Sequence, residues 1–283
     1  MQIQNWLFIG ASVQGSYHLA NNIPCQDAHF YRYYKENNFW ICVISDGAGS
    51  CEFSHIGSGK VVELSLEHFS EILKIKIDEW LKDSSTISNE VWHEISKNTF
   101  QKVYEDLKKF ANEEGYDLKS LSATVILIIV TSLGLLVTHI GDGRAGYRNE
   151  NGEWKSMITP FKGEFANETV FITSPIWDKD KLDLYIESQI ITEPSDAIVL
   201  LSDGCENICF ETVVFNEKHK SYEHINKPFK EYLDPMVETI KTLYNQGKSL
   251  EEINRLWEEY LINGTEELAL EPDDKTLIIG VKV

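Results

Sequence analysis

Two apolar runs of strand length end in the same polar triplet, and this feature constrains the fold most strongly. Residues 41–50 read ICVISDGAGS, and residues 197–207 read AIVLLSDGCEN. Each run is aliphatic and partly β-branched, as in a strand buried on both faces. A carboxylate beside such a strand costs free energy unless it is paired or coordinated. Asp-Gly is also a favoured turn dipeptide, so only the repetition indicates a shared site.

The remaining apolar pattern predicts strand hairpins separated by long helices. Turns at 131–134 and 149–152 join short apolar runs, as hairpin turns do. Apolar stripes predict helices over 57–75 and 88–113, and a capping box at 249–252 starts another helix. This order lacks strict strand–helix alternation, so we expect an α+β fold of mostly antiparallel sheets that pack on each other and are covered by helices. The other expected elements are strands at 6–13, 27–34, 39–45, 123–130, 135–140, 145–148, 153–157, 170–173, 182–188, 197–201 and 276–283, helices at 230–244 and 249–262, and an irregular loop at 215–227.

The composition argues against several classes of partner. Asp and Glu number 45 against 26 Lys and Arg, which gives a formal net charge of −19. A chain this acidic repels polyphosphate backbones and anionic lipid, so we expect no nucleic-acid partner and no membrane binding. No apolar run is long enough to span a membrane, and the first residues lack the features of a signal peptide. The five cysteines form no CxxC pair, which favours reduced thiols in a cytoplasmic protein.

Acidic residues stand at several strand ends beside Gly, Ser or Asn. If these ends converge, the acids form a cluster of oxygen donors with no His or Cys among them. Such a cluster repels itself and is tolerable only with bound cations. Hard oxygen donors select Mg²⁺ or Mn²⁺ over zinc. The residues at these junctions are Asp27, Asp46, Asp142, Asp203, Asp273 and Asp274.

The motifs that carry these acids occur in an order that resembles one enzyme family. They read NIPCQDA, DGAGS, SATVILIIV followed by VTHIGDGRAGY, LLSDG and DDKTLIIGV. In this order they resemble the metal-dependent protein phosphatases of type 2C, and most of all the bacterial branch. The resemblance extends over nearly the whole chain. It implies one catalytic domain over residues 1–283, a four-layer α/β/β/α sandwich, and a serine/threonine phosphoprotein phosphatase that uses Mg²⁺ or Mn²⁺.

The resemblance implies a role for each acid around two metal ions. Asp46 is expected to bridge the ions, and Gly47 to offer its carbonyl oxygen. Asp203 and Asp273 are expected to bind the second ion, with Asp274 as the alternative to Asp273. Asp46 and Asp203 are therefore also the expected catalytic residues.

Two further acids and two departures from the family pattern complete the expected site. Asp142 is expected to help hold a third, weaker ion, and Asp27 to accept hydrogen bonds from metal-bound water. The residue before Asp27 is usually Glu and here is Gln26, and the Arg that grips phosphate in many members is replaced by Asn22. His18 is the expected substitute, as a phosphate contact or proton donor. The alternative is that His18 is an ordinary surface or core histidine.

The implied reaction is two-metal hydrolysis of a phosphomonoester. A suitable metal lowers the pKa of bound water from about 15.7 to about 7, so a metal-bridging water can attack phosphorus in line. The expected partners are proteins that carry phosphoserine or phosphothreonine, and a cognate kinase is left open. Two alternatives remain. One is a catalytically weak pseudophosphatase that binds a partner as a regulatory module, and the other is a phosphoesterase for small molecules.

Three further positions have expected roles. The stretch GEFANETVFITS at 163–174 resembles the flap beside the site of bacterial members and is expected to help choose substrates. Arg144 is expected to be a structural partner of nearby acids rather than a phosphate clamp. His139 is expected to be a buried histidine with its hydrogen bonds satisfied.

Overall fold

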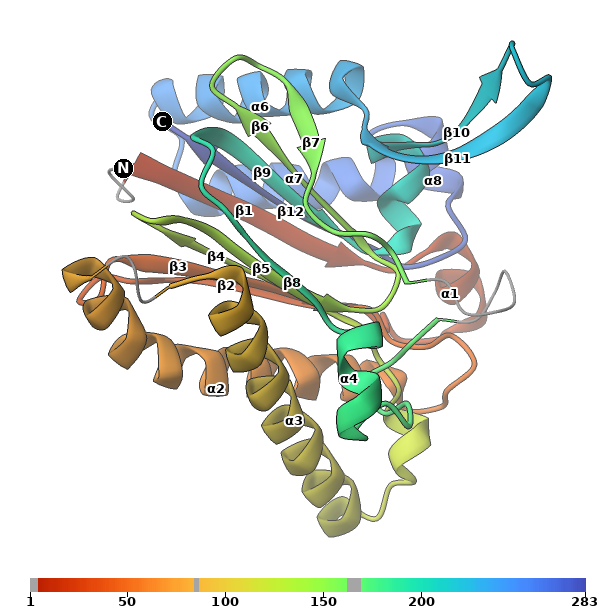
Figure 1. The fold of residues 1–283 in the computed structure, drawn as a ribbon. Coiled ribbons are helices and arrows are strands. Elements are labelled where there is room, and N and C mark those ends of the chain that lie inside the picture. Colours follow the sequence, from red (N-terminus) through yellow and green to blue (C-terminus); the bar gives the residue numbers. More distant parts are fainter. Residues whose placement is uncertain (1–4, 84–86, 162–168) are drawn as a thin grey trace.

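Two antiparallel sheets form the centre of the protein (Figure 1). The computed structural model describes residues 5–83, 87–161 and 169–283. In this part of the chain the first sheet has the strand order β1-β12-β9-β6-β7, the second has the order β2-β3-β4-β5-β8, and all neighbours are antiparallel. The strands are β1 (Trp6–Val13), β2 (Ala28–Tyr34), β3 (Phe39–Ser45), β4 (Val125–Thr131), β5 (Gly134–Ile140), β6 (Arg144–Asn149), β7 (Trp154–Ser156), β8 (Glu187–Ile191), β9 (Ser195–Leu201) and β12 (Lys275–Lys282).

Helices cover the outer face of each sheet (Figure 1). The helices α2 and α3 pack on the second sheet, and α6 and α7 pack on the first. The expected four-layer α/β/β/α sandwich is thereby confirmed. The helical elements are α1 (Ser16–Asn21), α2 (Ser54–Lys82), α3 (Asn89–Glu114), η3 (Leu118–Leu121), α4 (Lys179–Tyr185), η4 (Asp203–Cys205), α5 (Glu206–Cys209), α6 (Lys230–Asn245), α7 (Leu250–Asn263) and α8 (Glu266–Leu270).

Alternate residues of one strand enter different apolar cores. In β3, Cys42 and Ile44 pack between the sheets, whereas Ile41 and Val43 pack under α2 and α3. Side chains of a strand point to opposite faces in turn, and both faces of these sheets are covered. This is why the strand that ends at Ser45 is a continuous apolar run rather than an alternating one.

Local signals in the sequence place the ends of the main helices. Ser88 caps α3, where its hydroxyl accepts a hydrogen bond from the Val91 N–H, and Gly115 ends the helix with a φ of 80°. A left-handed end of this kind favours glycine. The capping box of Ser249 and Glu252 starts α7 as expected. The helix α2 extends to Lys82, beyond the expected end at residue 75.

Three expected elements are wrong. The strand expected at 182–188 begins only at Glu187, where β8 starts, and residues 182–185 belong to α4. Leu182 and Ile186 face one core while Leu184 is exposed, which is helical spacing. No strand forms at 170–173. The expected loop at 215–227 is a hairpin of β10 (Phe210–Asn216) and β11 (Ser221–Pro228), whose polar residues hid the strand pattern.

Two sequence predictions, on the cysteines and on membrane-spanning segments, can be compared with the described residues. The five cysteines are free thiols. Within the described ranges, no helix is long and apolar enough to cross a membrane.

Candidate active site

Four of the predicted acids meet in one pocket of about 360 Å³ at one end of the sandwich. Asp46 directly follows β3, and Asp142 connects β5 to β6. Asp203 directly follows Ser202 at the end of β9, and Asp273 precedes β12. Strands of both sheets therefore end at the same place, as the repeated strand-to-acid junction predicted. The pocket wall is formed by Asp46, Gly47, Ala48, Gly49, Ser50, Thr124, Asp142, Thr169, Phe171, Asp203 and Asp273.

The loop after β3 is held by backbone contacts on both sides. The Thr124 hydroxyl accepts from the Asp46 N–H at 3.1 Å, and the Thr124 N–H donates to the Asp46 carbonyl at 2.8 Å. Gly47 donates to the Gln26 carbonyl at 3.1 Å, and a Cβ on Gly47 would stand 2.5 Å from that same oxygen. The close approach of the Gln26 backbone is thus one reason why residue 47 is glycine.

The turn that carries Asp273 is clamped between two glycines. A Cβ on Gly204 would overlap the Asp274 carbonyl oxygen, and a Cβ on Gly15 would overlap the Pro272 and Asp273 carbonyl oxygens. Both glycines are needed for close backbone approach rather than for a left-handed φ.

The structure separates the two adjacent acids at the start of β12. Asp273 lies on the pocket wall, whereas Asp274 is only 2% exposed and points away from it. The Asp274 carboxylate accepts from the Gly15 N–H at 2.8 Å and from the Gln26 N–H at 2.5 Å. Asp274 therefore ties three segments of the chain together behind the pocket, and Asp273 is the acid that faces a ligand.

His18 lies behind the pocket, contrary to the role expected for it. Its ring is buried, and Nδ1 lies 2.8 Å from Oδ1 of Asp274. It is not one of the wall residues, so phosphate contact or protonation by His18 has no geometric support. The alternative, a core histidine with a partner, agrees with this position. Asn22, the other departure, is an exposed residue with a φ of 54° at the end of α1 and is likewise absent from the wall.

Asp27 is buried next to the pocket rather than on its wall. Its Oδ2 accepts a hydrogen bond from the Ser202 hydroxyl at 2.7 Å. Burial raises the pKa of Asp27 to about 7, and the charges of Asp274 and Asp203 add to the rise. Its position just behind Asp203 is compatible with an outer-shell role.

The acids on the wall destabilise one another as anions. Burial raises the pKa of Asp46 well above its usual value. The negative charge of Asp27, which lies behind the wall, and those of the wall acids Asp203, Asp142 and Asp273 raise it further. Burial, followed by the charges of Asp273 and Asp142, raises the pKa of Asp203 to about 7. Within the described residues, neither Asp46 nor Asp203 makes an ion pair with a basic side chain. The pocket therefore concentrates negative charge that bound cations or protons would relieve.

The donor set of this pocket fits a hard divalent cation. The groups of the wall that could bind a cation are carboxylate and carbonyl oxygens, and no His or Cys side chain is among the wall residues. The Gln26 Oε1 is buried and has no hydrogen-bond partner within the described chain, and it lies 3.9 Å from where a Cβ on Gly49 would stand. In residues 5–83, 87–161 and 169–283, no three His, Cys, Asp or Glu side chains form a ready-made ligand group. The chemistry of the donors, rather than a preformed coordination geometry, supports a metal here.

Sequence reasoning missed part of the wall. The Thr169 hydroxyl donates a hydrogen bond to Asp142, and Phe171 lies beside it on the wall. Both belong to the stretch 163–174 that was expected to be a flap. Residues 162–168 lie outside the described part of the chain. Thr124, also on the wall, stands in the SAT motif, which could have identified it.

The prediction for Arg144 is confirmed. The prediction for His139 is confirmed only in part, because the ring is buried but its Nδ1 has no hydrogen-bond partner within the described chain. The Arg144 Nε lies 2.9 Å from a Glu206 carboxylate oxygen, and its NH1 donates to Asn226 Oδ1 at 2.5 Å. Arg144 is thus a structural partner. His139 is fully buried, and its Nε2 lies 3.1 Å from the Thr159 carbonyl oxygen. Burial lowers the pKa of His139 to about 4, so the ring is neutral at pH 7.

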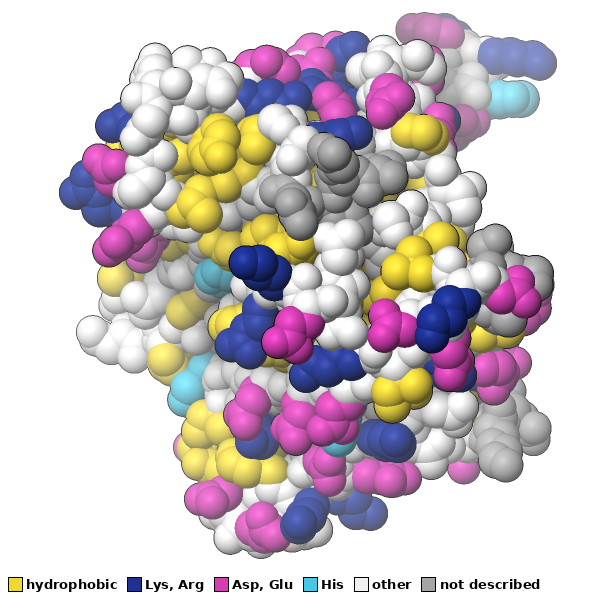
Figure 2. Space-filling model, turned by 90° about the vertical axis from the view of Figure 1, so that its left-hand side faces the viewer, with side chains coloured by type: hydrophobic (Ala, Val, Ile, Leu, Met, Phe, Trp, Pro, Cys, Tyr) yellow, Lys and Arg dark blue, Asp and Glu magenta, His cyan; other side chains and the backbone are white. Residues whose placement is uncertain are grey.

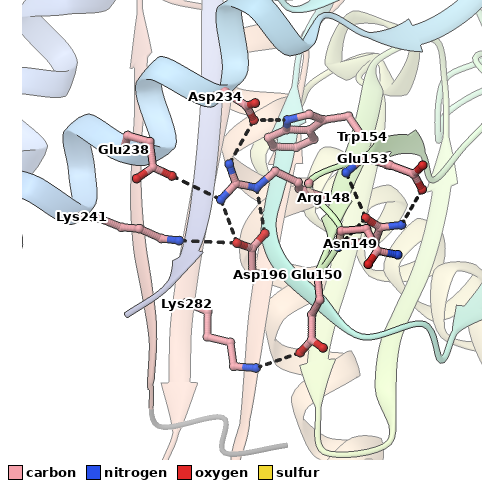
Figure 3. Close-up of polar contacts among 12 residues, drawn as sticks. Arg148, Asn149, Glu150, Glu153, Trp154, Asp196, Asp234, Glu238, Lys241 and Lys282 are labelled. Atoms are coloured by element: carbon pink, nitrogen blue, oxygen red, sulfur yellow. Dashed lines mark hydrogen bonds and ion pairs between the residues drawn. The ribbon is translucent and has the colours of Figure 1, made fainter.

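A second group of acids lies between the first sheet and α6, and it is fully paired (Figure 3). The Arg148 guanidinium donates twice to Asp196, with both distances 2.8 Å, and once to Asp234 at 3.0 Å. The Trp154 indole N–H also donates to Asp234 at 2.8 Å. Burial opposes ionisation of Asp196, but the hydrogen bonds and charge of Arg148 outweigh it and lower the pKa of Asp196. We call Arg148, Asp196 and Asp234 the Arg148 cluster.

Comparison with known proteins agrees with the fold and with the order of motifs. The family model described as "Protein phosphatase 2C" matches residues 14–253, and the chain belongs to this family of serine/threonine protein phosphatases. "Serine/threonine-protein phosphatase 3" of Escherichia coli (strain K12) is 25% identical over 208 residues, which are 72% of this chain and 75% of the relative.

Solved structures of bacterial phosphatases share the fold. Serine/threonine phosphatase Stp1 from Staphylococcus aureus matches with a TM-score of 0.53 and 14% identity, over 98% of this chain and 94% of that one. The catalytic domain of the serine/threonine protein phosphatase PstP, solved in complex with two manganese ions, matches with a TM-score of 0.54 and 14% identity, over 98% and 97% of the two chains.

Proposed function

We propose that this chain is a Mg²⁺- or Mn²⁺-dependent phosphatase that hydrolyses phosphoserine and phosphothreonine in proteins. The observation that carries the proposal is the meeting of Asp46, Asp142, Asp203 and Asp273 in one pocket. These acids come from four distant parts of the sequence. The charges of Asp142, Asp203 and Asp273 raise the pKa of Asp46, and those of Asp142 and Asp273 raise the pKa of Asp203. If each acid only formed a local turn, the acids would be spread over the surface instead.

Two ions would be held by the wall acids. Asp46, the Gly47 carbonyl, Asp203 and Asp273 would be the groups that hold them. Asp142 would serve a third ion, and Asp27 would orient water from behind. Bound divalent ions supply a Lewis acid for the phosphoryl oxygens and lower the pKa of water to about 7. PstP, of the same fold, was solved with two manganese ions, which supports this proposal.

The chain's own residues would bind and position the phosphoryl group. The loop after Asp46 is built from small residues, so a phosphate can approach its backbone closely. Gly49 and Ser50 are exposed on the wall, and their N–H groups make no hydrogen bond within the described chain. We propose that these N–H groups take over the phosphate contact of the missing Arg.

The proposal also includes the substrates of the protein and its cellular compartment. The substrates would be phosphorylated proteins in the cytoplasm, and residues 1–283 would act as one catalytic domain. The high negative charge of the chain supports the absence of nucleic-acid and membrane partners. The intact set of wall acids argues against the pseudophosphatase alternative, although Gln26 and Asn22 do depart from the family pattern.

Hydrolysis of a phosphothreonine peptide with added Mn²⁺ tests the proposal. Wild type should release phosphate, and Asp46→Asn and Asp203→Asn should each lose more than about 100-fold in activity, since even second-shell changes at metal sites cost 10–100-fold. Titration calorimetry should show weaker Mn²⁺ binding by both variants.

Asp196→Asn is the matched control, because Asp196 belongs to the Arg148 cluster and lies away from the pocket wall. It should keep both activity and Mn²⁺ binding. Equal inactivity of wild type and both pocket variants would contradict the proposal. Absence of tight Mn²⁺ binding by wild type, together with no hydrolysis, would favour the regulatory module instead.

A further inference from the structure

The hairpin of β10 and β11 projects from the body of the protein (Figure 1). We call residues 210–228 the arm. Within the described chain its two strands pair only with each other, in a sheet of their own. Figure 2 shows it at the upper right beyond the body, where acidic, basic and histidine side chains surround its tip. Two-stranded hairpins are marginally stable in water when nothing covers them.

One face of the arm is apolar and aromatic. Val213 and Phe215 share a face of β10, and the register places His224 and Tyr222 directly across from them. The Phe215 and Tyr222 rings meet edge to face with their centroids 5.2 Å apart. Tyr222 is 75% exposed and Phe215 is 41% exposed, so the pair is in contact with solvent. Exposed apolar patches of this kind mark interaction sites.

The root of the arm is fixed to the loops of the active-site pocket. Arg144 stands two residues after Asp142 and pairs with Glu206, which stands three residues after Asp203. The same guanidinium donates to Asn226 of β11. The turns that carry Asp142 and Asp203 and the second strand of the arm thus share one buried side chain.

Arg144 also lies over the Phe210 ring, with Cζ 5.5 Å from the centroid. Phe210 and Pro228, the two ends of the arm, are buried, and a Cβ on Gly146 would stand 2.8 Å from the Pro228 ring. The root is therefore rigidly packed, whereas the outer part is exposed. An arm mounted in this way can hold a partner at a fixed place relative to the pocket.

The charge of the arm differs from that of the body. Residues 211–227 contain three lysines and three glutamates, so this stretch has no formal net charge with His neutral, in a chain whose net charge is −19. Lys218 and Lys220 stand at the tip. An acidic polypeptide is repelled by most of this chain, and it is repelled least at the arm.

We propose that the apolar face of the arm, formed by Val213, Phe215, Tyr222 and His224, is a docking surface for the phosphorylated protein substrate itself. Phe215 lies five residues beyond the buried Phe210, roughly 17 Å along the strand from the root beside the pocket loops, so we expect a small phosphoester in the pocket not to reach the Phe215 and Tyr222 rings. A protein with its phosphorylated residue in the pocket can reach both. This inference rests on the proposed phosphatase function and adds a determinant of substrate class to it.

Steady-state kinetics on two substrates test the inference. The variant Phe215→Ser/Tyr222→Ser should lower kcat/KM for phosphorylated casein about tenfold, mainly through KM, since truncation of exposed aromatic anchors at interfaces costs this much or more. Its kcat/KM for p-nitrophenyl phosphate should not change. Val214→Ser is the matched control, because Val214 is 44% exposed on the opposite face of the same strand, and it should leave both values unchanged.

A second variant covers the case in which the double substitution unfolds the arm. Replacement of residues 212–225 by a short Gly-Ser turn retains Asn226 and should give the same selective loss. Unchanged casein kinetics, equal losses on both substrates, or an equal loss with Val214→Ser would overturn the inference. So would a wild-type dimer that the double variant converts to a monomer, because the arm would then bind a second copy of the chain.

The proposed function and the arm can fail separately. If wild type hydrolyses neither substrate with Mn²⁺, the phosphatase proposal fails. Calorimetric binding of phosphorylated casein to wild type and to the double variant then still decides the role of the arm. Weaker binding by the double variant supports docking, and equal binding contradicts it.

Discussion

The Arg148 cluster and the active-site pocket each gather carboxylates from separate parts of the chain, but they balance the charge in different ways. In the Arg148 cluster, one guanidinium makes three hydrogen bonds to Asp196 and Asp234 (Figure 3). In the pocket, Asp46 and Asp203 face other acids. The pKa of Asp196 is lowered, and those of the two pocket acids are raised.

This difference distinguishes a structural cluster from a functional one. An acid that has its cation within the protein stabilises the fold and has no need of a ligand. An acid held among other acids weakens the fold until something neutralises it, and perturbed groups of this kind gather at functional sites. The sign of the pKa shift, together with the partners, therefore tells which group of acids awaits a ligand.

The largest expected effect follows from removing the cation of the paired cluster. Arg148→Met should lower the free energy of unfolding by about 3 kcal/mol, because it leaves Asp196 and Asp234 partly buried without a partner. Urea denaturation at pH 7 measures this change. Mn²⁺ affinity should stay the same, and an altered affinity would show that the two clusters are not independent.

Lys282→Met is the matched control for this substitution. The Lys282 ammonium lies 3.6 Å from Glu150, whose side chain is 59% exposed, so the pair is a surface ion pair (Figure 3). Such pairs contribute little, and the change should be within about 0.5 kcal/mol. A loss as large as that of Arg148→Met would refute the contrast between buried and exposed pairing.

An intermediate effect of opposite sign is expected in the pocket. Asp203→Asn should raise the free energy of unfolding of the metal-free protein by about 2 kcal/mol at pH 8, because it removes a charge that burial and neighbouring acids disfavour. The folded-state pKa of about 7 lies above the unfolded value of 3.8, so the native state binds more protons between these values and wild type loses stability as pH rises through this window.

The gain from Asp203→Asn should therefore disappear near pH 4, where the Asp203 carboxyl is largely protonated in the folded protein. Asp196→Asn should behave in the opposite way, with a loss of stability at pH 8 that shrinks as pH falls below 3.8. Thermal unfolding in EDTA over pH 2–8 measures both. The same sign for the two variants would contradict the comparison of the clusters.

The smallest expected effect concerns the buried pair behind the pocket. His18→Ala and Asp274→Asn should each destabilise the protein, and the double variant should lose about 1 kcal/mol less than the sum of the two, since removing the Asp274 charge relieves the loss of its partner. A double-mutant cycle by denaturant unfolding measures this coupling. Strict additivity would show that the 2.8 Å contact has no energetic role.

The architecture was largely predictable from the sequence because burial on both faces leaves a clear pattern. Continuous apolar runs such as 41–44 fit strands with cover on both sides, and the Ser-Asp-Gly triplets that follow them indicated where the strands meet. The arm was missed because its strands lie in solvent and carry polar residues with no alternation toward a core. The helix α4 was missed because the spacing of Leu182, Leu184 and Ile186 also fits a strand, and only the exposure of Leu184 decides.

The site was predictable down to its acids but not to their orientation. Asp273 and Asp274 are adjacent, and only the three-dimensional contacts of Asp274 with the Gly15 and Gln26 backbones show which of them faces the pocket. The position of His18 behind Asp274 depends on the same contacts. Thr169 reaches Asp142 across 27 residues of chain, a contact that no local pattern encodes.

The clamp of Gly15 and Gly204 on the turn before β12 has a consequence for how the enzyme can be damaged. Because neither glycine has room for even one methyl group, an alanine at either position must push the backbone of Pro272, Asp273 or Asp274 outward. That movement would misalign an acid of the pocket while leaving the full set of carboxylates in the sequence. Loss of activity in this chain can therefore arise from steric displacement at residues that contribute no chemistry of their own.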